Sequence, residues 1–117
     1  MTNETSYNGY TNYETWNVSL WIDNDQGEQE FWQEQAKATL EAHLTLRASA
    51  GSFTTTYVGT VEEDSAYALS QELQSHFEDN NPLADKPSTY SDMLSAALRV
   101  VNWYEIATNM IEQAKDA

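Results

Sequence analysis

The feature that most constrains the fold of this chain is a helix-start signal that recurs along it. At 11–14, 60–63 and 102–105, a Thr or Asn is followed three positions later by Glu, close to apolar residues at helical spacing. The side chain of such a Thr or Asn accepts a hydrogen bond from a backbone N–H of the first turn, and the Glu can bond back to the N–H of the capping residue. The chain is therefore expected to be mainly helical.

Apolar periodicity predicts about five short helices in one compact domain. The first is expected from about Asn12 to Asp23, although its alternating apolar residues would also fit a half-buried strand. The others are expected at roughly 28–46, from Thr60 to near Glu78, from Ser88 or Thr89 to near Asn102, and from Asn102 onward. The side chains expected in the core of the last four are Phe31, Trp32, Ala36, Leu40, Leu44, Tyr67, Leu69, Leu73, Phe77, Met93, Leu94, Ala97, Leu98, Val101, Ile106, Ala107, Met110 and Ile111.

The 117 residues are expected to form a single acidic helical domain, 1–117, with a flexible segment at 1–10. Between the second and third helices the composition changes to Ala, Ser, Gly and Thr. The stretches LTLRA and FTTTYV could pair there as a small β-hairpin around residues 44–58. An irregular loop is the preferred interpretation, because an isolated two-stranded unit is marginally stable.

The most unusual property of the sequence is its net charge of −14, from 19 acidic residues against 5 basic ones. A surface of this sign repels phosphate and anionic lipid and attracts basic proteins, which argues against direct binding to nucleic acid or to a membrane. The alternative is that the charge serves only solubility or adaptation to a salty cytoplasm. The chain has no cysteine and lacks an apolar run of the about 18 residues that a membrane span needs, so a cytoplasmic protein is expected.

No motif points to catalysis, a metal or a cofactor. Three acidic residues of the segment 23–34 fall at positions 1, 3 and 12 of a calcium-binding EF-hand loop, but Gly27 lies one place before the glycine that the loop requires. The two histidines, His43 and His76, lie in different predicted helices, and neither has the spacing of a zinc motif. We therefore expect a protein that is not an enzyme and holds neither metal nor cofactor.

The acidic residues themselves are the remaining candidate for a functional surface. On a helix, side chains three or four positions apart lie about 5 to 6 Å from each other, comparable in scale to the charge spacing along a DNA strand. The leading hypothesis is a small binding protein that inhibits a basic host protein, either a nucleic-acid-binding or a defence protein, by presenting a DNA-like negative surface. The residues assigned to this surface are Glu30, Glu34, Glu41, Glu62, Glu63, Asp64, Glu72, Glu78 and Asp79.

A second hypothesis assigns binding to the aromatic residues. Three tyrosines in the segment 7–13 precede Trp16, and Trp32 and Trp103 begin other predicted helices. Exposed aromatic residues are common at binding hot spots. A module that docks on a partner or forms a homodimer through them would use its charge only for solubility. More often, such residues fill the core of a small helical domain.

Two segments of the chain resemble motifs of a group of short proteins carried on bacterial chromosomes, plasmids and phage genomes. They are NYETWNVSLWIDND at 12–25 and DMLSAALRVVNWYEIA at 92–107. Members of that group pair an N-terminal NYETWNVALWxxND-like segment with a C-terminal NWxEIA-like segment. The resemblance implies a phage or mobile-element context and no particular mechanism.

The resemblance also implies how the ends of the chain meet. The two segments contain three of the four tryptophans, Trp16, Trp21 and Trp103, which are therefore expected to pack together. Such packing would bring the first and last helices into contact around Asn17 and Asn102. Partner specificity would then reside in the middle of the chain, at 26–86.

Overall fold

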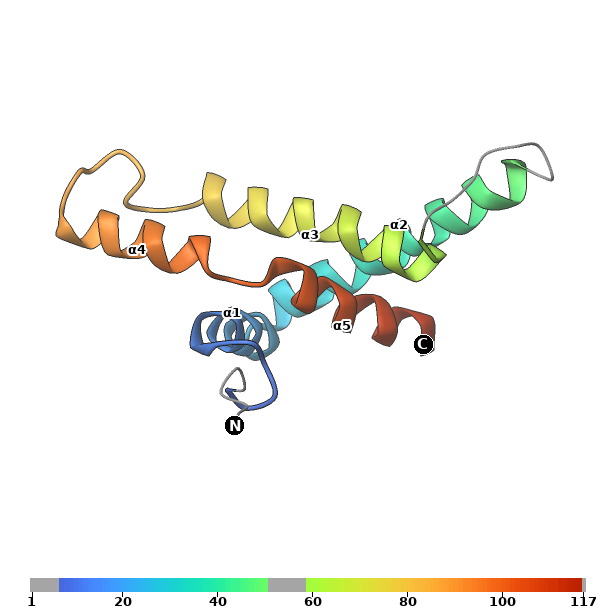
Figure 1. The fold of residues 1–117 in the computed structure, drawn as a ribbon, viewed down its shortest axis with the longest axis horizontal. Helices are drawn as coiled ribbons and strands as arrows, with labels where there is room; N and C mark the ends of the chain where they lie inside the picture. The colour runs from blue at the N-terminus through green and yellow to red at the C-terminus, as the bar shows by residue number, and fades with distance from the viewer. Residues whose placement is uncertain (1–6, 51–58, 117) are drawn as a thin grey trace.

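The computed structural model describes residues 7–50 and 59–116, and five helices make up most of that part of the chain (Figure 1). The mainly helical fold expected from the sequence is confirmed. The β structure in the described residues is one isolated bridge between Tyr7 and Tyr10. The helices are α1 (Tyr13–Asn24), α2 (Gln26–Ala50), α3 (Val61–Asp79), α4 (Thr89–Arg99) and α5 (Trp103–Asp116).

Four of the helices pack together and the fifth extends from them. Helices α3 and α5 lie side by side, α2 packs against both, and α1 contacts α2 and α5 (Figure 1). Helix α4 makes only sparse contacts with the other helices and lies at one end of the molecule. The radius of gyration is 16.3 Å, against about 13 Å for a spherical domain of this length, so the molecule is elongated.

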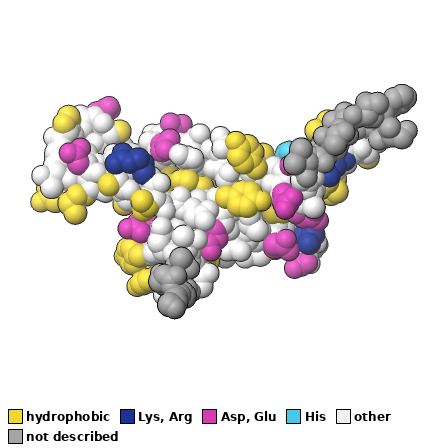
Figure 2. Space-filling view, in the orientation of Figure 1, with side chains coloured by type: hydrophobic (Ala, Val, Ile, Leu, Met, Phe, Trp, Pro, Cys, Tyr) yellow, Lys and Arg dark blue, Asp and Glu magenta, His cyan; other side chains and the backbone are white. Residues whose placement is uncertain are grey.

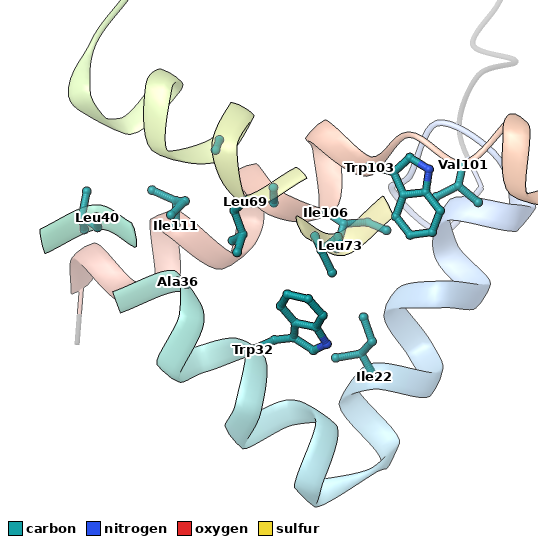
Figure 3. Packing of buried hydrophobic residues seen from close by; sticks show 12 residues of the cluster. Ile22, Trp32, Ala36, Leu40, Leu69, Leu73, Val101, Trp103, Ile106 and Ile111 are labelled. Carbon is teal, nitrogen blue, oxygen red and sulfur yellow. The ribbon is translucent and has the colours of Figure 1, made fainter. Parts of the chain in front are cut away.

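The core lies where α2, α3 and α5 meet, with α1 closing one side. The indole of Trp32 lies between Ile22 of α1 and the side chains of α3 and α5 (Figure 3). These side chains exclude water from the contact surfaces of all four helices, which is the main stabilising term for short amphipathic helices. The buried apolar residues are Ile22, Trp32, Ala36, Leu40, Ala66, Leu69, Leu73, Val101, Trp103, Ile106, Ala107 and Ile111.

Four residues expected in the core are exposed instead. Phe31 and Leu44 flank the buried stripe of α2 at Trp32, Ala36 and Leu40, so only the centre of the predicted apolar face is covered. Tyr67 of α3 and Met93 of α4 are 62% and 66% exposed. Helix α4 packs sparsely, and no neighbouring helix covers Met93.

The alternative to an irregular loop, a small hairpin around residues 44–58, is wrong in its first strand. Residues 44–50 are the last two turns of α2, which continues past the predicted end at Leu46. The second strand, at 51–58, lies outside the described residues, as does the segment 1–6 of the predicted flexible end. Tyr7 is described and packs on Trp16, with the ring centroids 5.1 Å apart.

Three of the predicted helix starts are confirmed. Thr60 and Glu63 form a reciprocal capping box at α3. Ser88 caps α4, and Asn102 accepts a hydrogen bond from the Glu105 N–H at the start of α5, at 3.0 Å. The predicted box at 11–14 is wrong, because the cap of α1 is Asn12, one residue later, and its side chain accepts from the Thr15 N–H at 2.9 Å.

The starts of α1 and α5 exchange hydrogen bonds, in which the donors are the N–H of Asn102, the cap of α5, and the N–H of Thr11, the residue before the cap of α1. In an ordinary capping box, the side chain at the third helical position bonds back to the cap of its own helix. Here Thr15, at that position of α1, accepts from the backbone N–H of Asn102, the cap of α5, at 2.8 Å. Glu105, at the same position of α5, accepts from the Thr11 N–H at 3.0 Å. The two helix starts therefore satisfy each other's donors.

The expected packing of three tryptophans is wrong. Trp103 is buried against Phe77, whereas Trp16 packs on tyrosines near the start of α1. Trp21 is 65% exposed, because the buried face of α1 follows Thr15, Ser19 and Ile22. The predicted contact between the first and last helices is confirmed at Asn102 but not at Asn17, which bonds to Tyr13 of its own helix.

We predict that Thr15→Val destabilises the protein by about 1–3 kcal/mol, because a methyl group would replace the hydroxyl that accepts the Asn102 N–H. Thr108→Val is a matched control: its hydroxyl oxygen is buried and has no hydrogen-bond partner among the described residues. Loss of that hydroxyl should leave stability unchanged or raise it. Urea unfolding of both variants measures the difference in stability. Equal midpoints would contradict a structural role for the hydrogen bond between Asn102 and Thr15.

Candidate partner-binding surface

The predicted acidic residues of α2 lie on its outer side, opposite the buried stripe. Glu30, Glu34 and Glu41 are all exposed, and they span about 16 Å along the helix axis at about 1.5 Å per residue. Lys37 is exposed on the same side, one turn from both Glu34 and Glu41. We call these four residues the α2 strip. It carries three carboxylates and one ammonium group, so it is negative but not uniformly so.

The acidic residues at the start of α3 have structural partners. Asp64 forms an ion pair with Arg47 at 2.7 Å, and Arg47 also donates to the Gly59 carbonyl. These contacts join the end of α2 to the start of α3. Glu62 lies 3.9 Å from Lys115 of α5, and Glu63 accepts from the Thr60 N–H of the capping box. Asp64 and Glu62 therefore form contacts between helices, and Glu63 stabilises the start of its own helix.

The remaining predicted residues, Glu72, Glu78 and Asp79, are exposed along the second half of α3. Glu78 accepts a hydrogen bond from Gln74 one turn earlier, at 3.0 Å. On the face shown in Figure 2, acidic side chains form small groups with apolar side chains between them. This face presents a mixed acidic and apolar surface rather than a continuous row of carboxylates.

The segment 23–34, compared with a calcium loop above, consists of the end of α1, the linking residue Asp25 and the first turns of α2. The Asp25 side chain accepts from the Glu28 N–H at 3.0 Å, so it caps α2. Glu28 accepts from the Trp32 indole N–H at 3.2 Å and lies 3.9 Å from the His76 ring. Within residues 7–50 and 59–116, no group of three or more His, Asp or Glu side chains is placed to hold a metal ion.

An apolar groove of about 370 Å³ lies between α1, the end of α3 and α4. Its apolar lining includes Trp21 and Ile22 of α1, Phe77 of α3, and Leu94 and Leu98 of α4. Sequence reasoning missed this groove because it expected Trp21 in the core. The available signal was the i, i+4, i+7 spacing of Thr15, Ser19 and Ile22, which places Trp21 beside the buried face of α1.

Asp23 is an acidic residue that sequence reasoning did not single out as part of a surface. Partial desolvation raises the pKa of its carboxyl above the ordinary value of 3.8. Its neighbours along two small hollows beside α5 include Ile22 and Met110. Its position in the last turn of α1 is also unfavourable for a negative charge, because the helix dipole is negative there.

The comparisons with known proteins identify a family whose function is unknown. Residues 3–115 match the family described as "Family of unknown function (DUF7249)", and because the match covers nearly the whole chain, the protein belongs to this family. The searches of curated proteins and of solved structures gave no match. In the described residues, no helix is both long and apolar enough to cross a membrane.

We predict that Asp23→Asn raises the melting temperature at pH 7. Because the folded-state pKa is raised, the folded protein binds the proton more tightly, and stability falls as pH rises from about the ordinary value of 3.8 through the folded-state pKa. The full cost is present at neutral pH, so the gain from Asp23→Asn should shrink on acidification. Asp85→Asn, in the exposed turn before α4, controls for the general effect of removing one negative charge. An equal gain from both variants at pH 7 would contradict the prediction.

Proposed function

We propose that this protein binds a basic surface on a partner protein through its exposed carboxylates. A nucleic-acid-binding host protein, held away from its substrate, is the class of partner that such a surface suits best. The resemblance to phage and plasmid proteins fits an inhibitor of a host defence protein. The proposal concerns binding alone and assigns no catalytic step.

The observation that carries this proposal is the α2 strip. Its three carboxylates are exposed and lie within about 16 Å along the axis of one rigid helix. Elsewhere, Arg47 and Lys115 pair with acidic groups of neighbouring helices, and Lys37 is the one basic residue in the strip. A patch with a net negative charge of this kind attracts a basic partner and accelerates encounter, most strongly at low salt.

A DNA-binding protein is favoured as the partner by the overall charge. A net charge of −14 on 117 residues gives a field of the same sign as that of a nucleic acid. The acidic groups on the face shown in Figure 2 are separate, so the likeness to a nucleic acid lies in the sign of the charge and not in a regular row of phosphates. A defence nuclease and a transcription factor both meet this description.

A second candidate function is docking through apolar and aromatic side chains. The observation that favours it is the exposure of Trp21, at 65%, beside the apolar groove. Binding of this kind holds or strengthens as salt is added, whereas binding through carboxylates weakens. Salt dependence therefore separates the two functions.

The experiment that tests the first function is capture of partners from a lysate of the native host with the tagged protein, washed at low and at high salt. The expected result is a nucleic-acid-binding protein that is retained at low salt and displaced by added duplex DNA. Retention that is unchanged from low to high salt would contradict binding through carboxylates.

We predict that Glu30→Gln/Glu34→Gln/Glu41→Gln weakens binding to the captured partner by about tenfold or more at low salt, since electrostatic coupling across an interface is worth about 1.4 kcal/mol or more. Lys37→Gln is the opposite control, because it makes the same strip more negative and should strengthen binding. Calorimetric titration at two salt concentrations measures both effects. All four side chains are exposed, so thermal unfolding should differ little between the variants and the parent.

If the two variants changed the affinity in the same direction, the strip would not act through its charge.

A further inference from the structure

The most exposed tryptophan of the described chain lies beside its principal apolar groove. Trp21 is 65% exposed, although tryptophan is among the costliest side chains to leave in water. Trp21 borders the groove together with Ile22, the next residue of α1, which is buried. Large aromatic side chains at the edge of an apolar depression are typical of the hot spots at which proteins bind each other.

The groove is lined by α1, the start of α2, the end of α3, residues 80–82 and α4, and most of its apolar side chains come from three of the helices. Trp21 and Ile22 belong to α1, Phe77 to the end of α3, and Leu94 and Leu98 to the inner face of α4. The volume of about 370 Å³ is at the lower end of the range of about 300–1,000 Å³ for ligand sites. A few large apolar side chains from an extended or helical segment would fill this space, but a folded domain would not enter it.

The charged groups along the groove all favour a cationic neighbour. Asp25 and Glu28 line it, and neither lysine nor arginine does. The remaining titratable side chain is His76, which lies 3.9 Å from Glu28 and packs on the Trp32 ring. A segment that entered with its apolar side chains would therefore place its flanking residues beside carboxylates.

We propose that this groove binds an amphipathic segment of a partner protein, in which two or three large apolar side chains are flanked by Lys or Arg. The inference rests on the proposed function in one respect, that the partner is basic. It adds the place where the partner is anchored and the side chains that it inserts. Apolar contacts at Trp21 and α4 would hold the segment, and the carboxylates of Asp25 and Glu28 would set its charge preference.

A second copy of this chain is a poorer occupant of the groove. Two copies would each bring a net charge of −14, and a symmetric contact would place the same carboxylates of Asp25 and Glu28 opposite one another. Like charges that face each other across an interface oppose association. A basic segment meets the same apolar lining without that repulsion.

The probe is a fluorescein-labelled peptide of about 15 residues, built from Leu at i, i+3, i+4 and i+7 with Lys elsewhere, added to the full-length protein. Two matched peptides serve as controls. The first replaces every Lys by Glu, and the second keeps every Lys but replaces Leu by Ser. Fluorescence anisotropy at physiological salt should show tight binding of the Leu/Lys peptide and at least about tenfold weaker binding of both controls.

The variants locate the binding site. Trp21→Ala and Leu94→Ala should each weaken binding of the Leu/Lys peptide by about tenfold, as expected for hot-spot side chains. Asp25→Asn should weaken the binding less and reduce its salt dependence. Asn at this position can still cap α2. Tyr90→Ala and Met93→Ala are matched controls, because both residues are exposed on α4 but do not line the groove. Circular dichroism checks that each variant is folded.

Three results would overturn the inference. Equal binding of the peptide to the parent, to Trp21→Ala and to Leu94→Ala would show general attraction to the acidic surface. Stronger binding of the Ser control peptide than of the Leu peptide would exclude apolar anchoring. If sedimentation velocity showed a dimer of the parent and a monomer of Trp21→Ala, the occupant would be a second copy of the chain.

The inference and the proposed function fail separately. If changes in the charge of the α2 strip left binding of the captured partner unchanged while the groove variants no longer bound the peptide, the groove proposal would be supported and the proposed function contradicted. If the groove variants bound the peptide normally while the α2 strip variants no longer bound the partner, the proposed function would be supported and the groove proposal contradicted.

Discussion

The hydrogen bonds between the starts of α1 and α5 fix where α1 and the end of α4 lie against the core that α2, α3 and α5 form. Thr15 accepts from Asn102, and Glu105 accepts from Thr11, so each helix start completes the other. The side-chain amide of Asn12 also donates to the Val100 carbonyl at 2.8 Å, just after α4 ends. These bonds join the beginning of the described chain to residues 100–105. They fix α1 beside α5 and the end of α4 beside the start of α1, and so they align two walls of the apolar groove.

The helix caps could be predicted from the sequence, but the hydrogen bonds between the starts of α1 and α5 could not. Asn102 and Thr60 cap their helices as expected, because a cap depends on residues only three positions apart. The partners of Thr15 and Glu105 are 87 and 94 positions away. Local patterns carry no information about such pairs. Trp21 is a different case, because the local spacing of Thr15, Ser19 and Ile22 places it outside the buried face, but two of these residues are small and polar and do not stand out as a core pattern.

The sequence identifies the acidic residues, but it does not show which of them pair with basic residues in the fold and which are left exposed. The sequence does not distinguish Asp64 from Glu34, yet Asp64 is paired with Arg47 between two helices and Glu34 points into solvent from the α2 strip. The difference arises because the chain has few basic residues, and folding places Arg47 and Lys115 beside particular carboxylates. A partly buried pair stabilises the fold more than an exposed one, where solvent screens the charges. The acidic groups left without such cations define the surface available to a partner.

The sparse packing of α4 has a consequence for how the molecule moves. An isolated helix of 11 residues is marginal in water, so α4 owes its stability to its own capping box and to the few apolar side chains along one face. Local opening in proteins costs least where such contacts are few. Opening of α4 is therefore expected to cost less free energy than opening of the core around Trp32. Because Leu94 and Leu98 of α4 line the groove, that wall is expected to be the one most readily displaced.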